Sequence, residues 1–316
     1  MRLTRIAAVP AALAVLAVAS CKKDSTGPGG TLGAVTCSAS DAAVCPPAGL
    51  ALGFNGTAGT PTITPADART SLSVSSSDYV VGGLTSSATS GYWFIVVGNT
   101  LVAWGNIGVA SGAYTANIPL FCGQQAVIYR FDNATGHSYW YANITLGSCA
   151  VPLFRAQLTW DTYTDDTLNS DMDLHLVRPS GITNSSNDCY FANCDAGGLE
   201  WGASGAAGNP VLDVDNTVGY GPENITMASG PEAGTYRVLV YNYSGYAGTH
   251  PTVKLYFNDH EQVRYTSAQP LDWPNNAWWN VATVDIANKV ITAVNTYSSA
   301  APAPPNRPAA VMPRKP

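Results

Sequence analysis

Acidic side chains gather between residues 158 and 224, and they are the groups in this chain best suited to do chemistry. Residues 171–176 read Asp-Met-Asp-Leu-His-Leu, and residues 211–215 read Val-Leu-Asp-Val-Asp. In an extended strand, alternate side chains lie on one face, so each pair of aspartates would share a face. Two carboxylates at that spacing repel each other unless a positive group lies between them.

A hard cation would remove this repulsion, since Ca²⁺ takes ~6–8 oxygen ligands. The stretch therefore predicts a Ca²⁺ site that orders its loops. The candidate ligands are the carboxylates of the two strands and their neighbours in the chain: Asp161, Asp171, Asp173, Asp213, Asp215 and Glu223. Alternatively, these aspartates end strands and cap turns, because Asp and Asn bond readily to nearby backbone amides. Both interpretations stay open.

The sequence features that would indicate an enzyme are weaker than those that indicate a cation site. An enzyme needs a nucleophile within reach of a base, a facing pair of carboxylates or an open metal site. His175 shares a predicted strand face with Asp171 and Asp173, so a His–Asp pair could form there. The chain contains no GxSxG elbow, HExxH motif, phosphate-binding loop or dinucleotide-binding motif. We expect that it is not an enzyme.

The elements that position these residues are predicted to be strands. Hydrophobic residues make up 46% of the 316 residues and charged residues only 11%, with 30 Gly and 21 Pro, which favours turn-rich β-structure. Apolar segments alternate with turn signals at intervals of roughly 8–12 residues. We predict an all-β chain with two antiparallel β-sandwich domains, immunoglobulin-like over residues 35–150 and jelly-roll-like over residues 151–297. The boundary lies at Val151-Pro152, since proline interrupts strand pairing.

Several segments carry hairpin signals. Residues 92–97 and 101–104 flank Gly98-Asn99, and residues 252–257 and 262–265 flank Asn258-Asp259. Alternating apolar positions in residues 234–241 predict a core strand, and residues 278–284 and 290–295 predict the closing strands.

The N-terminus is predicted to be a signal peptide over residues 1–20. Two arginines precede an apolar run, residues 6–19, that is too short to span a bilayer. The run ends Val18-Ala19-Ser20-Cys21, which resembles the bacterial lipobox. The resemblance implies cleavage before Cys21 and lipid on that residue, which anchors a protein without spanning the membrane. An ordinary secretory signal is the alternative.

Lys22 stands where lipoproteins of this type carry the aspartate that retains them at the inner membrane. We therefore expect a cell-envelope protein at the outer membrane or cell surface. Residues 21–34 are predicted to form a flexible tether and residues 298–316 a disordered tail rich in Pro and Ala. The net charge of −6 and the scattered basic residues argue against a nucleic-acid partner.

Cysteine count supports export. Assigning Cys21 to lipid leaves six cysteines, and an even set in an exported protein indicates disulfides. Zinc is disfavoured because no CxxC pair is present. The sequence leaves the connectivity open, although proximity along the chain favours three pairs: Cys37–Cys45, Cys122–Cys149 and Cys189–Cys194.

Tryptophans provide an alternative function, carbohydrate binding, because aromatic faces stack on apolar sugar faces. The candidate ligand platforms are Trp201, Trp273, Trp278 and Trp279. Trp278 and Trp279 are adjacent, so they point to opposite faces of a strand. We expect at most one of them in the core, and the other exposed or under a loop.

The motifs LTWD, DMDLHLVRPSG, CYFANC, LEWG, LDVDNTVGYGPENI and GTYRVLVYNYS occur in this order. By these motifs, the region of about residues 153–297 resembles the YfaP-type domain of bacterial secreted proteins and lipoproteins, a family of unknown function. Its DxDL strand and GPE turn match Asp171, Asp173, Leu174, Pro222 and Glu223, and the resemblance implies no catalytic role for them. The region is less closely similar to bacterial pre-peptidase C-terminal β-sandwiches, some of which bind calcium. The expected function is a lipid-anchored, non-catalytic binding or adhesion module whose ligand is a protein or a polysaccharide.

Overall fold

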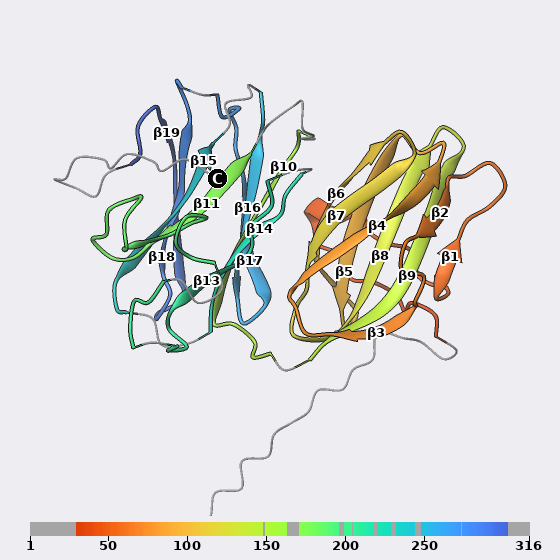
Figure 1. The fold of residues 1–316 in the computed structure, drawn as a ribbon, viewed down its shortest axis with the longest axis horizontal. Coiled ribbons are helices and arrows are strands. Elements are labelled where there is room, and N and C mark those ends of the chain that lie inside the picture. Colours follow the sequence, from red (N-terminus) through yellow and green to blue (C-terminus); the bar gives the residue numbers. More distant parts are fainter. Residues whose placement is uncertain are drawn as a thin grey trace, which may run out of the picture.

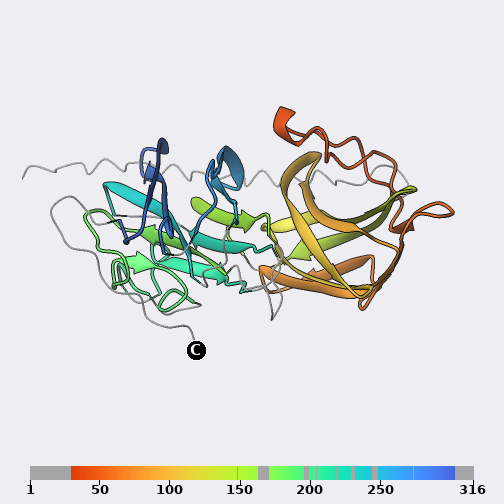
Figure 2. The same ribbon diagram turned by 90° about the horizontal axis from the view of Figure 1, so that it is seen from above.

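The computed structural model describes residues 30–147, 149–162, 171–195, 199–203, 205–217, 220–228, 232–243, 248–272 and 274–302. These residues form two β-sandwiches that lie side by side (Figures 1 and 2). A single turn of 3₁₀ helix, η1 (Ala39–Asp41), interrupts the β-structure. The prediction of an all-β, largely antiparallel fold is confirmed.

The N-terminal sandwich is one long sheet that folds over on itself. Its strand order is β1-β9-β8-β5-β6-β7-β4-β2, and β3 pairs with β9 in parallel. Strand β6 connects the layers, because it pairs with β5 up to Ile107 and with β7 from Gly108 onward. The strands are β1 (Gly53–Asn55), β2 (Thr62–Pro65), β3 (Ser71–Val74), β4 (Asp78–Ser86), β5 (Ser90–Val97), β6 (Thr100–Ala110), β7 (Ala113–Pro119), β8 (Gly123–Asn133) and β9 (Gly136–Leu146).

The C-terminal sandwich has two antiparallel five-stranded sheets, ordered β13-β14-β10-β16-β17 and β12-β11-β15-β18-β19. Its strands are β10 (Phe154–Trp160), β11 (Met172–Val177), β12 (Asp188–Cys189), β13 (Pro210–Val214), β14 (Glu223–Met227), β15 (Thr235–Asn242), β16 (Pro251–Phe257), β17 (His260–Thr266), β18 (Trp278–Asp285) and β19 (Val290–Ser298). Leu158 and Ile225 of the first sheet pack against Leu174, Val240 and Trp279 of the second.

The hairpin predictions agree with these strands. Gly98, in the turn between β5 and β6, has φ +60, which suits glycine. Asn258 and Asp259 both have positive φ between β16 and β17, as a tight two-residue hairpin turn requires. The three cysteine pairs favoured by proximity are the disulfides of the structure: Cys37–Cys45, Cys122–Cys149 and Cys189–Cys194.

Two residues from the predicted tether and tail are buried in the described part of the chain. Leu32, placed in the tether, is buried, and its N–H donates to Leu50 O at 2.8 Å. Ala301, placed in the disordered tail, is buried as well. The predicted signal peptide and Cys21 lie outside the described residues. Within the part of the chain that the structure describes, no helix is long and apolar enough to cross a membrane.

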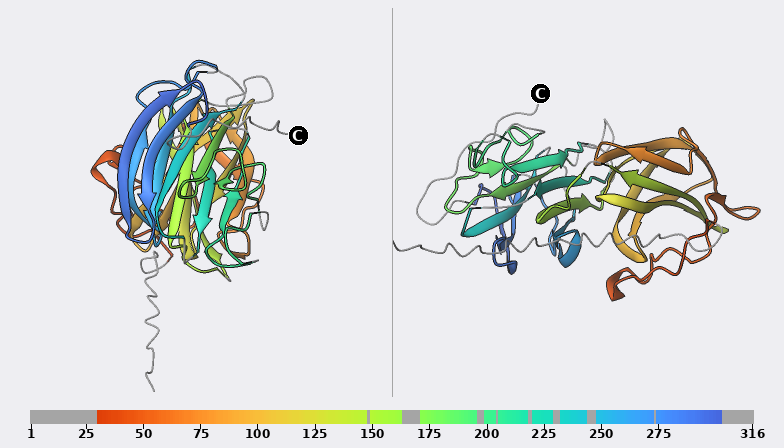
Figure 3. Two further views of the ribbon diagram at one scale, coloured as in Figure 1. Left: turned by 90° about the vertical axis from the view of Figure 1, so that its left-hand side faces the viewer. Right: turned by 90° about the horizontal axis from the view of Figure 1, so that it is seen from below.

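The outer face of sheet β13-β14-β10-β16-β17 packs against the N-terminal sandwich, and the right-hand view of Figure 3 shows the two units adjoining. Tyr256 Oη donates to Val102 O at 3.1 Å, and the guanidinium of Arg155 lies 4.2 Å from the centre of the Phe121 ring. Polar side chains on the outer face of this sheet are therefore enclosed between the two units.

Candidate metal centre

Three of the predicted ligands come together at one edge of the C-terminal sandwich, where β11 of one sheet meets β14 of the other. Asp171 immediately precedes β11, Asp173 lies within it, and Glu223 is the first residue of β14. One carboxylate oxygen from each residue lies within 4.8 Å of the other two. All three side chains are buried. Glu223, which lies 50 and 52 positions after the two aspartates in the chain, thus joins them in one carboxylate cluster.

Strand alternation explains how Asp173 reaches this edge. Met172, Leu174 and Leu176 pack in the core, as predicted, so Asp173 and His175 project from the opposite face of β11. Strand β12 pairs only with the end of β11, at Leu176 and Val177. Earlier in β11, Glu223 approaches instead, and its Oε2 accepts the Leu174 N–H at 2.6 Å. This carboxylate therefore links the two sheets.

The spacing of the three carboxylates suits one cation. Three ionised groups this close repel one another by roughly 3 kcal/mol per pair at an effective dielectric constant of about 20. Ca²⁺ binds oxygens at ~2.3–2.6 Å, so two ligands of one ion lie at most about 5 Å apart. The observed limit of 4.8 Å falls within such a coordination sphere. An all-oxygen donor set fits Ca²⁺ or another hard cation better than zinc.

The other three predicted ligands lie outside this cluster, which corrects the expected six-residue site. The pairing of β13 with β14 shifts register between Leu212 and Val214, so Asp213 lies at a bulge. The expected alternation is kept, since Leu212 and Val214 are buried. Asp213 is half-buried and Asp215 is exposed. Burial raises the pKa of Asp213 to about 6, and the charge of Arg155 opposes that rise. Asp161 instead accepts the His250 N–H on its Oδ1 at 2.7 Å, beside a different cavity.

His175 has a partner that the sequence did not indicate. Its Nδ1 lies 2.8 Å from Asp188 Oδ2, and both side chains are fully buried. The His175 ring stacks on Tyr190 at 5.0 Å and contacts Trp278 at 4.9 Å. The pair therefore packs the loop that follows β11 onto the strand. Asp188 lies 13 residues from His175, and no local spacing rule connects them.

Aromatic rings enclose the cluster on the outer side. A closed series of ring contacts, each at most 6.4 Å between centroids, covers this face. Its members are His175, Tyr190, Phe191, Tyr243, Tyr241 and Trp278. Asp173 lies opposite Tyr241 in the strand register. Burial, followed by the charges of Asp188 and Asp173, raises the pKa of Tyr190 to about 12. The disulfide loop that carries Tyr190 and Phe191 thus lies close to Asp173.

The tryptophan platform prediction is wrong for both members of the adjacent pair. Trp279 is fully buried in the main core, where its Nε1 donates to Asn295 Oδ1 at 2.9 Å. Trp278 is also buried, beneath the C-terminal segment that contains Ala301. Neither ring can stack on a sugar. Trp201 is half-buried, packs on Tyr236 and donates to a backbone oxygen; Trp273 lies outside the described residues.

No protein-family model matches this chain, so the resemblance to the YfaP-type domain stays a prediction. Among solved structures, it is similar to titin immunoglobulin tandem domains, with a TM-score of 0.21 and 11% identity over 64% of this chain and 96% of that one. It is also similar to the BSP domain of a biofilm-associated protein, with a TM-score of 0.19 and 12% identity over 67% of this chain and 29% of that one. Similarities of this size assign no function.

Proposed function

We propose that the chain is a non-catalytic binding or adhesion module of the bacterial cell envelope, with a C-terminal sandwich stabilised by Ca²⁺. Asp171, Asp173 and Glu223 would hold the ion. The observation that carries the proposal is this buried cluster, whose carboxylate oxygens lie within 4.8 Å of one another. Ion binding would favour the folded state, because it replaces mutual repulsion with attraction to a shared charge.

The position of the cluster explains what the ion would do. Asp173 belongs to one sheet, with Asp171 just before its strand, and Glu223 belongs to the other, so a shared cation would join the sheets at the sandwich edge. The disulfide loop and its aromatic rings cover the same edge. The proposed role of Ca²⁺ is therefore to fix these loops as a rigid surface for a partner.

Two features support the envelope location. Three disulfides are typical of proteins that fold in oxidising compartments. The lipobox-like sequence at Cys21 supports an N-terminal lipid anchor. Together they favour an exported protein held at a membrane surface.

Thermal unfolding of the full chain in EDTA and in millimolar Ca²⁺ tests the proposal. A ligand that binds only the folded state adds about 2.7 kcal/mol at a hundredfold excess over its Kd. We expect a Tm several degrees higher in Ca²⁺. An identical melting curve under both conditions would remove the cation from the proposed function.

A further inference from the structure

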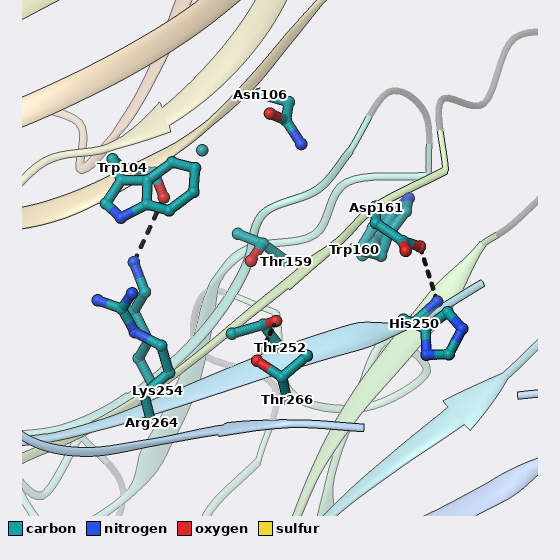
Figure 4. A pocket seen from close by; sticks show the side chains of 11 residues that line it. Trp104, Asn106, Thr159, Trp160, Asp161, His250, Thr252, Lys254, Arg264 and Thr266 are labelled. Carbon is teal, nitrogen blue, oxygen red and sulfur yellow. Dashed lines mark hydrogen bonds between the residues drawn. The ribbon is translucent and has the colours of Figure 1, made fainter. Parts of the chain in front are cut away.

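A second site lies at the junction of the two sandwiches, away from the carboxylate cluster. A cavity of about 230 Å³ opens between β6 of the N-terminal unit and β10, β16 and β17 of the C-terminal unit (Figure 4). Trp104 and Asn106 line it from β6. The opposite wall is the outer face of sheet β13-β14-β10-β16-β17. The strand register fixes which side chains of this face lie next to one another.

The floor of this junction cavity is a row of hydroxyl groups. Thr159 lies directly opposite Thr252, which lies directly opposite Thr266, so three neighbouring strands each contribute one threonine. The Oγ1 atoms of Thr252 and Thr266 are 3.0 Å apart. Each hydroxyl can both donate and accept a hydrogen bond, which suits a ligand that carries several hydroxyls itself.

One end of the junction cavity holds a buried cation. Lys254, two positions along β16 from Thr252, is only 2% exposed. Its Nζ donates to Trp104 O at 3.3 Å and lies 5.4 Å from the centre of the Trp104 ring, toward which it points in Figure 4. Within the described residues it forms no ion pair. Burial, followed by the nearby charge of Arg264, lowers its pKa to about 7.

The neighbouring Arg264 is already neutralised. Its guanidinium donates to both carboxylate oxygens of Asp41, at 2.5 and 2.9 Å, and contacts Glu261 at 3.2 Å. Lys254 is therefore the positive group at this end that lacks an anionic partner among the residues described. A negatively charged ligand group would pair with the Lys254 ammonium group and offset the cost of burying its charge.

The other end of the junction cavity holds a hydrogen-bond acceptor and adjoins a second cavity. Asp161 lies there, with its Oδ1 bonded to the His250 N–H. A second cavity of about 310 Å³ shares Asn106 and Asp161 with the first and is lined by Tyr92 further on. The two cavities therefore adjoin at Asn106 and Asp161.

We propose that the junction cavity binds an acidic sugar, a uronate residue, with its carboxylate at Lys254 and its ring hydroxyls on the threonine row. Trp104 supplies an aromatic surface for the apolar face of the ring. Asp161 accepts hydrogen bonds from hydroxyls at the far end. The inference deepens the binding function proposed above by naming a ligand class, and its site is separate from the cation site.

Other ligand classes use only part of this arrangement. A simple carboxylate would use Lys254 but leave the threonine row without a ligand partner, whereas a neutral sugar would leave Lys254 unneutralised.

Calorimetric titration of the full chain with galacturonate, galactose and acetate at pH 6 separates these cases. We expect galacturonate to bind at least tenfold more tightly than the other two. Equal binding of galactose or acetate, or no binding of galacturonate, overturns the proposal.

The pH dependence gives a second readout. The charged and titratable groups around Lys254 are Arg264 and Glu261 from β17, Asp41 from η1, and Asp161 and His250 at the far end. Since Lys254 loses its proton near pH 7, we expect galacturonate affinity to fall about tenfold between pH 6 and pH 8.5. Affinity that is constant over this range contradicts the role of Lys254.

Two variants locate the site. Lys254→Met should reduce galacturonate binding to the level of galactose, and Thr252→Val should weaken galacturonate binding about tenfold. Lys289→Met and Thr292→Val, at exposed positions of the C-terminal unit, are the matched controls and should bind as the wild type does. Circular dichroism verifies the fold of each variant. Unchanged binding by a folded Lys254→Met variant overturns the proposal.

The source of the uronate is tested with polygalacturonate. Tighter binding per site than the monosaccharide identifies a polymer that extends into the second cavity, and equal binding identifies a free sugar acid; both outcomes support the uronate site. Glu223→Gln should lose the response to Ca²⁺ and keep galacturonate binding, whereas Lys254→Met should do the reverse. The cation proposal and the sugar proposal can therefore fail separately.

Discussion

Asp173 is the residue on which the cation site depends most. It is fully buried, lies beside two further carboxylates and is covered by aromatic rings. Carboxylates crowded together in such an environment repel one another, and a bound divalent cation would be strongly held there. The same side chain should therefore destabilise the fold without the ion and stabilise it with the ion.

Asp173→Asn should consequently change stability in opposite directions under two conditions. In EDTA the variant loses one source of repulsion, so we expect it to be more stable than the wild type by about 1 kcal/mol. In millimolar Ca²⁺ it should be less stable, because it has lost a ligand. Chemical denaturation under each condition measures both values. Asp67→Asn, an exposed carboxylate in the other unit, is the control and should show neither effect. A variant that is destabilised equally in both buffers contradicts this account.

Lys254 makes a separate prediction about pH. Its folded pKa of about 7 lies below the 10.5 of an ordinary lysine, so the unfolded chain binds more protons between these values. The stability that the wild type gains as pH rises from 7 to 10 comes partly from this group. Lys254→Met should therefore be more stable than the wild type near pH 6, by about 2–4 kcal/mol, and the difference should shrink toward pH 10. Urea denaturation across this range checks it, and a difference independent of pH would contradict it.

Among the elements, the disulfide loop between Cys189 and Cys194 has the clearest role. It carries Tyr190 and Phe191 over the outer face of β11, and His175 with Asp188 anchors its base. By excluding water it strengthens the interaction between an ion and the carboxylates beneath. Ordering of the loop and affinity for the ion should therefore be coupled.

Replacing both Cys189 and Cys194 with serine should weaken Ca²⁺ binding about tenfold, since the loop must then be ordered at the expense of binding energy. Calorimetric titration with Ca²⁺ measures the change. The matched control replaces Cys37 and Cys45, which close a similarly short loop in the N-terminal unit, and should leave Ca²⁺ affinity as it was. Equal Ca²⁺ affinity in the two double variants would show that the Cys189–Cys194 disulfide does not contribute to Ca²⁺ binding.

Strand patterns and turns were predictable because they depend on local spacing. The alternation in residues 171–176 correctly placed Met172, Leu174 and Leu176 in the core. The bulge at Asp213 was not predictable, because it depends on pairing with β14. The same holds for the approach of Glu223 to β11 and for the pair between His175 and Asp188, which require knowledge of which segments meet in space.

For the whole molecule, the packing of the two sandwiches determines both rigidity and the junction cavity. Asp41 is central to it, since it accepts hydrogen bonds from Trp104 of its own unit and from Arg264 of the other. Burial raises the pKa of Asp41, but these hydrogen bonds together outweigh burial and lower the pKa to about 2. At neutral pH the carboxylate is thus ionised and joins the two units.

Asp41→Asn should uncouple the two sandwiches. The variant keeps the shape of the side chain and loses its charge, which leaves Arg264 with Glu261 alone. We expect the wild type to unfold in one calorimetric transition and the variant in two. Each Tm of the variant should lie within about 10 degrees of the wild-type Tm. Asp285→Asn, a half-buried residue at the end of β18 whose carboxylate bonds locally to Asn288, should unfold as the wild type does. Two transitions in the wild type would show that the contact contributes little.

Nothing in the sequence could have located the junction cavity. Its threonine row comes from three strands whose register is set by the complete sheet, and its roof comes from the other domain. The sequence directed attention to four tryptophans in the second domain, whereas Trp104 of the first domain lines this cavity. The contact between two independently predicted units therefore created a site that neither unit has alone.

The content of Ca²⁺ per chain tests the central claim most directly. Full chain dialysed against trace divalent cations and then analysed for metals should contain one Ca²⁺ per molecule, and the Asp173→Asn variant with Glu223→Gln should contain none. Wild-type protein without bound Ca²⁺, or equal Ca²⁺ in the wild type and the double variant, would contradict the cation site.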